Sequence, residues 1–366
     1  MTEVSPFALS RFEYEERHLF YLQPDIISRL AQPKPAYLVG SRGTGKTTLL
    51  KALHWKERRK NESLRVQLGS DIYHEHYLGV YFKLPEIQLG LLGRWLKLEE
   101  IDETVSASTI AFYLDLIWLE EISLAISELI ADEEFDVAAA VEHNCLRTIV
   151  SEFPSIFDNE YHFCPITLND FLRLVRDIRR NLETLASMRF SPIEMLKRYK
   201  ISWQIGAFGR IVGSHLAKLC NRREEKNKKV SWHFKICMDE GECLTEFQLK
   251  VLNTMLRLSK APAFFVASFV SMPADTTSTL IPNITLQQAD RELIPLDLMR
   301  MKDFEELVDG VATVRIRDRI GQEAKEFHTR NVLGDLNINA LLHEILGTSV
   351  SPKAQSLLCL ANKFSS

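Results

Sequence analysis

The stretch from residue 35 to residue 50, "PAYLVGSRGTGKTTLL", decides the fold. The apolar run at 36–39 suits a short, buried parallel strand, and Pro33 and Pro35 end any helix before it. After the glycines, "TTLLKALHWKERRK" carries apolar residues at helical spacing and predicts one helix. A strand, a glycine-rich loop and a helix therefore follow one another directly.

The loop has the spacing Gly-x-x-x-x-Gly-Lys-Thr of a phosphate-binding loop. Its glycines let backbone N–H groups turn inward around an anion, and the helix N-terminus adds partial positive charge. We expect Lys46 to reach the β- and γ-phosphates as a catalytic group, and Thr47 to ligate Mg²⁺. The absence of a guanine-reading Asn-Lys-x-Asp motif favours ATP. The residues predicted to bind the nucleotide are Gly40, Ser41, Arg42, Gly43, Thr44, Gly45, Lys46, Thr47 and Thr48.

A second predicted strand supplies the carboxylates that a nucleotide hydrolase needs. In "VSWHFKICMDEGECL", residues 230–244, an apolar run ends in Asp239 and Glu240. We expect Asp239 to hold the Mg²⁺, directly or through water, and Glu240 to polarise the attacking water. Glu242 is a weaker substitute because it lies further into the turn, and a solvated acidic pair is the alternative interpretation.

A third apolar strand, "APAFFVASFVS" at 261–271, follows the predicted helix "EFQLKVLNTMLRLSK". In nucleotide switches of this architecture, a polar residue at the end of the strand beside the Asp-Glu strand senses the γ-phosphate. Ser268 or Ser271 could take this part, although asparagine is the residue that we would prefer there.

These elements predict an α/β fold: a P-loop NTPase core, in which helices flank a parallel sheet, with a large helical insertion and a C-terminal helical lid. A strand at 79–84 belongs to the same sheet, and the long stretch before the Asp-Glu strand is helical in pattern. Within it, apolar residues from Leu168 to Leu185 follow heptad spacing, which favours packing inside the insertion or a coiled-coil contact. The predicted segments are 1–30, packing on the core; 31–94, the first part of the core; 95–228, the insertion; 229–300, the second part of the core; and 301–366, the lid.

Composition and charge are those of an ordinary soluble protein. From the sequence we expect neither a secretion signal nor a membrane span, and the six scattered cysteines favour a reduced, cytoplasmic protein. The net charge is −4, but residues 99–142 hold thirteen acidic and no basic residues, whereas residues 173–200 hold eight basic and three acidic ones. Solvated helix faces are the simpler explanation, and contact of 173–200 and 222–229 with nucleic acid is the alternative.

Three stretches together, "GSRGTGKT", "ICMDEGE" with "FQLKVLNTMLRL", and "FFVASF", resemble the AAA-type ATPases. More narrowly, they are similar to bacterial ATPases of the origin-recognition and STAND-like kinds, found in mobile-element and anti-phage defence loci. The resemblance implies ATP and Mg²⁺ as cofactors, a homo-oligomer, and an arginine that completes the site. The sequence departs from the family pattern in three ways: the sensor asparagine is missing, no arginine finger is obvious, and the lid lacks a clear sensor arginine motif. Arg291, Arg315 and Arg317 are candidates for the arginine.

Three functions stay open. The first is a slowly hydrolysing or partner-stimulated ATPase that acts as an oligomerising switch on a partner protein, with phage defence as a setting that the resemblance suggests. The second is a nucleic-acid-binding ATPase of the initiator or loader type. The third is an inactive scaffold, which the water-activating Glu240 argues against. A transporter-type ATPase is disfavoured because no LSGGQ-like segment precedes Asp239.

Overall fold

The computed structural model describes residues 24–61, 76–157, 165–193, 205–222, 230–271 and 277–297, with the single positions Leu22, Leu64 and Gly310. The chain divides into two units, one formed by residues 22–298 and the other by residues 1–21 and 299–366. All the described ranges lie in the first unit. The predicted lid at 301–366, Gly310 apart, and most of the predicted segment at 1–30 therefore lie outside the described residues.

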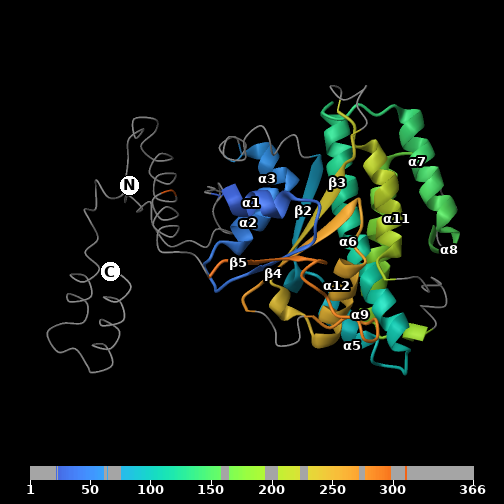
Figure 1. Ribbon diagram of the computed structural model, residues 1–366. Helices are drawn as coiled ribbons and strands as arrows, with labels where there is room; N and C mark the ends of the chain where they lie inside the picture. The colour runs from blue at the N-terminus through green and yellow to red at the C-terminus, as the bar shows by residue number, and fades with distance from the viewer. Residues whose placement is uncertain are drawn as a thin grey trace, which may run out of the picture. The chain divides into compact units, whose positions relative to one another are not determined.

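A sheet of five parallel strands forms the centre of the unit, in the order β2-β3-β4-β1-β5 (Figure 1). This arrangement confirms the predicted fold class of a parallel sheet flanked by helices. Because the strands are parallel, their carboxyl ends meet at one edge, where ligands of open α/β sheets bind. The strands are β1 (Ala36–Val39), β2 (Tyr77–Lys83), β3 (His233–Asp239), β4 (Ala263–Phe269) and β5 (Glu292–Pro295).

Strand β5 is the element that the sequence did not indicate. It has four residues, ends in a proline and lies at the edge of the sheet beside β1. A proline is tolerated there because an edge strand leaves one row of N–H groups unpaired. Because the strand is short and ends in a proline, it lacks the alternation of apolar and polar residues from which a strand is predicted.

The predicted helix after the phosphate loop is two helices, α2 (Lys46–Leu53) and α3 (Trp55–Lys60). The chain breaks at His54, whose backbone is extended (φ −69°, ψ 130°). The end of α2 packs directly against β2 at Gly79, where a Cβ would lie 1.9 Å from the carbonyl oxygen of Leu53. Tertiary contact with the sheet, which helical spacing alone does not reveal, thus decides where α2 ends.

Helices cover both faces of the sheet, with α2 and α3 on one side and α6 and α12 on the other (Figure 1). On the first side, α1 (Pro24–Ala31) leads to the carbonyl oxygens of Gln32 and Lys34, which accept hydrogen bonds from buried Lys235. On the second side, α12 (Glu246–Arg257) starts with a capping box between Thr245 and Gln248.

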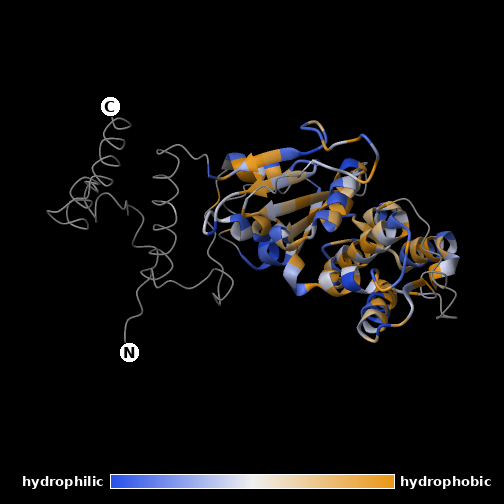
Figure 2. Ribbon diagram, turned by 90° about the horizontal axis from the view of Figure 1, so that it is seen from below, coloured by the Kyte–Doolittle hydropathy of each residue, from blue (hydrophilic) through white to orange (hydrophobic). Residues whose placement is uncertain are grey.

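The long stretch between β2 and β3 is helical in its described residues, as predicted, apart from one isolated bridge, Phe135 with Arg222. These helices share a single hydrophobic core with the sheet, as the rings of Trp118 and Phe234 show at 6.2 Å between centroids. Figure 2 shows hydrophobic residues concentrated in the strands and mixed with hydrophilic ones along the helices. The helices are α5 (Leu89–Trp95), α6 (Glu103–Ala131), α7 (Ala139–Glu152), α8 (Pro154–Phe157), α9 (Leu168–Ser187) and α11 (Ala207–Leu216).

The heptad seam from Leu168 to Leu185 lies on α9 and faces α6. Its members up to Leu182 are buried and Leu185 is half-buried, so packing inside the insertion accounts for the pattern. In the described part of the chain, no helix is both long and apolar enough to cross a membrane. Even α6, with 29 residues, carries Asp115 and four glutamates.

Candidate nucleotide-binding site

The phosphate loop leaves the end of β1 and enters α2 through two glycines in the left-handed region. Gly43 has φ +87° and Gly45 has φ +86°, a conformation that residues with a Cβ rarely adopt. Gly45 is also the N-cap of α2, so the first N–H groups of that helix face the loop. The motif thus folds into a turn that ends on a helix N-terminus, an arrangement that attracts anions.

Lys46, the first residue of α2, folds back over this loop. Its Nζ donates hydrogen bonds to the carbonyl oxygens of Gly40 at 2.5 Å and Ser41 at 2.8 Å. Burial lowers the pKa of Lys46, and the charges of Glu242, Asp239 and other neighbours act against that lowering. The structure therefore brings the predicted phosphate-binding ammonium group to the loop.

Asp239 is the centre of a hydrogen-bond cluster at the carboxyl ends of the strands. Its Oδ2 accepts from the hydroxyl of Thr47 at 2.7 Å and from that of Tyr81 at 3.0 Å. Its Oδ1 accepts from the hydroxyl of Ser268 and from the backbone N–H of Glu240, the latter at 3.0 Å. The side chain is buried, so these four donors replace the water that an ionised carboxylate would otherwise need.

The same cluster fits a magnesium ion in its chemistry. Mg²⁺ prefers oxygen ligands and keeps several waters, with one or two protein oxygens and the substrate phosphates completing its octahedron. Thr47 and Asp239 offer a hydroxyl and a carboxylate oxygen 2.7 Å apart beside the loop. No group of three metal-ligating His, Cys, Asp or Glu side chains is found among the described residues, which leaves this pair to be completed by phosphate and water.

Glu240 has an unusual backbone for a residue with a side chain. It adopts the left-handed conformation (φ 62°, ψ 47°), and its N–H also lies 3.2 Å from the hydroxyl of Ser268. Its carboxylate is 43% exposed and lies 3.6 Å from the ammonium group of Lys83. Such strained positions gather at functional sites because the surrounding structure must hold them in place. Glu242, the weaker candidate for polarising the attacking water, accepts a hydrogen bond from the N–H of Val270 at 3.3 Å.

Compared with models of protein families, the chain matches the one described as ORC-CDC6-like, over residues 4–357. The chain belongs to the ORC-CDC6-like family. The match includes the phosphate loop, Asp239 and the whole sheet, and it confirms the resemblance to origin-recognition-like AAA ATPases. The family is one of initiator-type P-loop ATPases, which implies nucleotide binding and ATPase activity in general terms. No similar curated protein and no similar solved structure was found.

Two side chains at this ORC-CDC6-like site, Tyr81 and Lys83, were not predicted. They are two residues apart on β2 and therefore point to the same face of the sheet. The register pairs Lys83 with Asp239 and Tyr81 with Cys237, which brings both side chains beside the Asp-Glu pair. The polar residues are visible in "GVYFKL", but only the order of the strands shows that β2 lies next to β3.

Asp297 is a third unpredicted residue. It follows β5, and both of its carboxylate oxygens lie 2.9 Å from the backbone N–H of Ser41 in the phosphate loop. Because β5 was not recognised in the sequence, nothing indicated that this aspartate would meet the loop.

The structure does not bring Arg291 to the site. Arg291 precedes β5, and Glu292 after it pairs with Ala36 at the start of β1, so Arg291 lies at the opposite end of the sheet from the phosphate loop. Its guanidinium group is buried against the ring of Tyr37, 4.7 Å from the centroid. Arg291 therefore does not complete the nucleotide site of its own chain, and a role at the site of a neighbouring subunit stays a prediction. Arg315 and Arg317 lie outside the described residues.

Of the two serines considered as sensors, only Ser268 belongs to the site. Ser271 lies beyond the end of β4 and is exposed, whereas Ser268 is buried and its hydroxyl donates a hydrogen bond to Asp239. Of the loop residues predicted to contact nucleotide, Ser41, Arg42 and Gly43 are exposed, and Thr48 is half-buried in the first turn of α2.

The basic segment at 173–200 is partly neutralised within the chain. On α9, Arg176 and Arg179 both bind Glu120 of α6, at 2.7 and 2.9 Å, and Arg179 also binds Glu183 at 2.7 Å. Arg173 and Arg180 are exposed on the same helix. Residues 194–200 and 223–229 lie outside the described residues.

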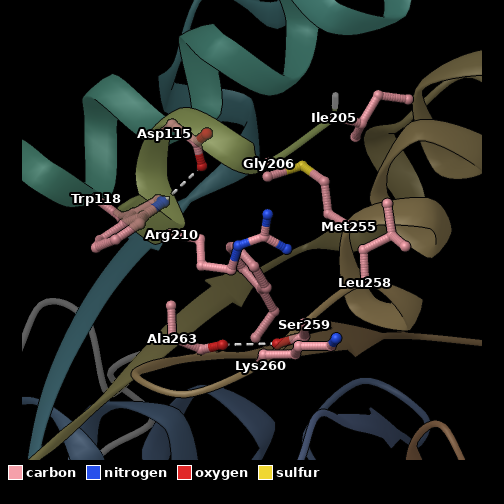
Figure 3. Close-up of a pocket in the computed structure, with 11 residues that line it drawn as sticks. Asp115, Trp118, Ile205, Gly206, Arg210, Met255, Leu258, Ser259, Lys260 and Ala263 are labelled. Carbon is pink, nitrogen blue, oxygen red and sulfur yellow. Dashed lines mark hydrogen bonds between the residues drawn. The ribbon is translucent and has the colours of Figure 1, made fainter. Parts of the chain in front are cut away.

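A separate small cavity lies between α6, α11, α12 and β4, with Asp115 and Arg210 in its wall (Figure 3). Its volume of about 20 Å³ has room for one or two water molecules but not for a nucleotide. Asp115 accepts hydrogen bonds from Trp118 Nε1 and from the N–H of Gly209, each at 2.9 Å, and so joins α6 to the first turn of α11. This cavity is structural and does not compete with the phosphate loop as a nucleotide site.

Proposed function

We propose that the protein binds ATP with Mg²⁺ at the phosphate loop and hydrolyses it slowly, as a switch that controls assembly with itself and with a partner protein. One observation carries the proposal: Thr47 at the start of α2 meets Asp239 at the end of β3 at 2.7 Å. Two segments far apart in the sequence thereby join the phosphate-binding element to the carboxylate that hydrolysis needs.

Each residue has a role in this proposal. The loop N–H groups and Lys46 would bind phosphate, and Thr47 with Asp239 would hold the Mg²⁺, which neutralises charge on the phosphates. Glu240 would accept the proton of the attacking water. Ser268 and Tyr81 would keep the Asp239 carboxylate in position, because each donates a hydrogen bond to it.

Two features support slow hydrolysis. The Glu240 carboxylate lies 3.6 Å from the Lys83 ammonium group, so this ion pair competes with the attacking water for the carboxylate oxygens. Of the candidates for an arginine that completes the site, Arg291 lies at the opposite end of the sheet from the phosphate loop of its own chain. An arginine that stabilises the transition state is worth roughly 10³–10⁵ in rate, so its supply by a neighbouring subunit or partner would couple hydrolysis to assembly.

The test compares the wild type, Lys46→Ala and Glu240→Gln, each with and without ATP and Mg²⁺, by mass photometry and by phosphate release. We expect Glu240→Gln to accumulate an ATP-dependent assembly with little phosphate release, and Lys46→Ala to lose ATP binding and assembly together. If Lys46→Ala assembled and released phosphate like the wild type, the proposal would be wrong.

The family match favours a second candidate, nucleic-acid binding by an initiator-type ATPase. Arg173, Arg180 and Arg189 are the exposed arginines on the described part of the basic segment, and the first two lie on α9. A DNA gel shift at two salt concentrations tests this candidate, with the double variant Arg173→Gln/Arg180→Gln beside the wild type. Binding that falls with salt and weakens in the variant supports it; no shift even at low salt excludes it.

A further inference from the structure

The phosphate loop already carries an anion of the protein itself. Both carboxylate oxygens of Asp297 lie 2.9 Å from the N–H of Ser41. A phosphate-binding loop offers inward-turned N–H groups to anions, and a carboxylate is an anion of the same kind.

The charge of Asp297 acts on Lys46, the residue that we propose to bind the phosphates. Asp297 acts on Lys46 electrostatically, in the direction that raises the pKa of Lys46. Ser41 connects the two groups directly, because its N–H meets Asp297 while its carbonyl oxygen accepts from Lys46 Nζ at 2.8 Å. A single residue of the loop, Ser41, thus connects the ammonium group and a competing negative charge.

Little holds the carboxylate on the loop. Asp297 is exposed, and among the described residues its hydrogen bond to Ser41 is the only one found. By contrast, its neighbour Leu296 is buried and donates its N–H to the carbonyl oxygen of Val39 at 2.7 Å, which fixes the backbone beside the loop. The carboxylate is therefore easily displaced from Ser41, yet its charge stays near the loop.

We propose that Asp297 is an internal competitor of nucleotide phosphate: its carboxylate occupies the rim of the phosphate loop and lowers the affinity of the loop for polyphosphates. Phosphates that enter the loop displace the carboxylate from Ser41 or bind against its charge. Asp297 thus sets nucleotide affinity without contacting the reacting atoms. This inference rests on the proposed function, because it requires that the loop bind phosphate.

The test measures dissociation constants of ATP, ADP and tripolyphosphate for the full-length wild type and Asp297→Asn by isothermal titration calorimetry. Asparagine keeps an oxygen that can accept from Ser41 but removes the charge. Loss of one unit charge a few ångströms from the phosphates should tighten binding about five- to tenfold at low salt, with a smaller gain at high salt. Tripolyphosphate should show the gain as well, because the competition is for phosphate and involves neither base nor ribose.

Two further variants show whether the effect belongs to Asp297 and whether it comes from its charge. Glu292→Gln removes a carboxylate from the other end of β5, where it binds Arg29 at 2.5 Å, and should leave all three constants unchanged. Asp297→Ala removes charge and acceptor together, and should also bind tripolyphosphate more tightly than the wild type does.

The outcomes are distinct. Unchanged or weaker binding in Asp297→Asn, while the wild type binds ATP and Lys46→Ala does not, overturns this inference and leaves the proposed function intact. Weaker binding would show that Asp297 supports the loop in its binding conformation, and unchanged binding would show that its charge does not affect affinity. Absence of ATP binding by the wild type would overturn the proposed function and this inference with it.

Discussion

Asp115 should make the stability of the protein fall as the pH rises. Its carboxyl group is buried in α6, and burial raises its pKa from 3.8 to about 7, although hydrogen bonds from Trp118 and Gly209 and the charge of Arg210 act against the rise. The folded state therefore keeps the proton of Asp115 to higher pH than the unfolded state does. The stabilisation is fully present below the unfolded pKa and is lost as the pH rises through the folded pKa.

The magnitude follows from the two pKa values. One pKa unit is worth about 1.4 kcal/mol, so the full effect of this group is on the order of 4 kcal/mol. Part of this stabilisation is already lost at about pH 5, so stabilisation on the order of 3 kcal/mol remains to be lost between about pH 5 and about pH 9. Asp115→Asn cannot titrate, so the stability of the variant relative to the wild type should rise by that amount over the same range.

The assay is urea unfolding of the wild type and the variant at both pH values. Asp102→Asn is the control, since Asp102 caps the same helix α6 from an exposed position and its pKa is lowered by hydrogen bonds to Thr104. With a folded pKa below its unfolded value, Asp102 stays ionised over this range, so its difference from the wild type should stay flat.

A direct measurement follows the indole N–H of Trp118, which donates to Asp115 Oδ1, by NMR. Its resonance should titrate with a midpoint near 7. A midpoint near 4, together with a difference between Asp115→Asn and the wild type that does not change with pH, would refute the reasoning.

Three further predictions concern the site and the sheet. Lys83→Met should raise the basal rate of phosphate release by up to about fivefold at unchanged ATP affinity, because a partly exposed ion pair such as that with Glu240 is worth about 1 kcal/mol; a slower rate would contradict this. Asp239→Asn should abolish the Mg²⁺-dependent part of ATP binding measured by calorimetry, since the amide is a poor ligand for the ion; Mg²⁺ dependence equal to the wild type would exclude the site. Gly79→Ala should cost about 3 kcal/mol or more in urea unfolding, because the new Cβ would lie 1.9 Å from the carbonyl oxygen of Leu53; an unchanged unfolding midpoint would show that α2 can move away.

The sequence alone determined the phosphate loop and the strand that bears Asp239. Both are local patterns: glycine spacing fixes a turn that only glycines can make, and a continuous apolar run marks a strand that is buried on both faces. The amphipathic spacing of α9 and α12 is local in the same way. These elements could be predicted because their cause lies within a few neighbouring residues.

The tertiary structure decided what meets the loop. Asp297 contacts the loop because β5 lies beside β1, and Tyr81 and Lys83 contact the Asp-Glu pair next to it because β2 lies beside β3. No short-range pattern encodes this order of strands. The same order removes Arg291 from the site, since parallel pairing of β5 with β1 places that residue at the far end of the sheet. The sequence thus names the groups that bind phosphate, whereas long-range pairing selects the charges around them.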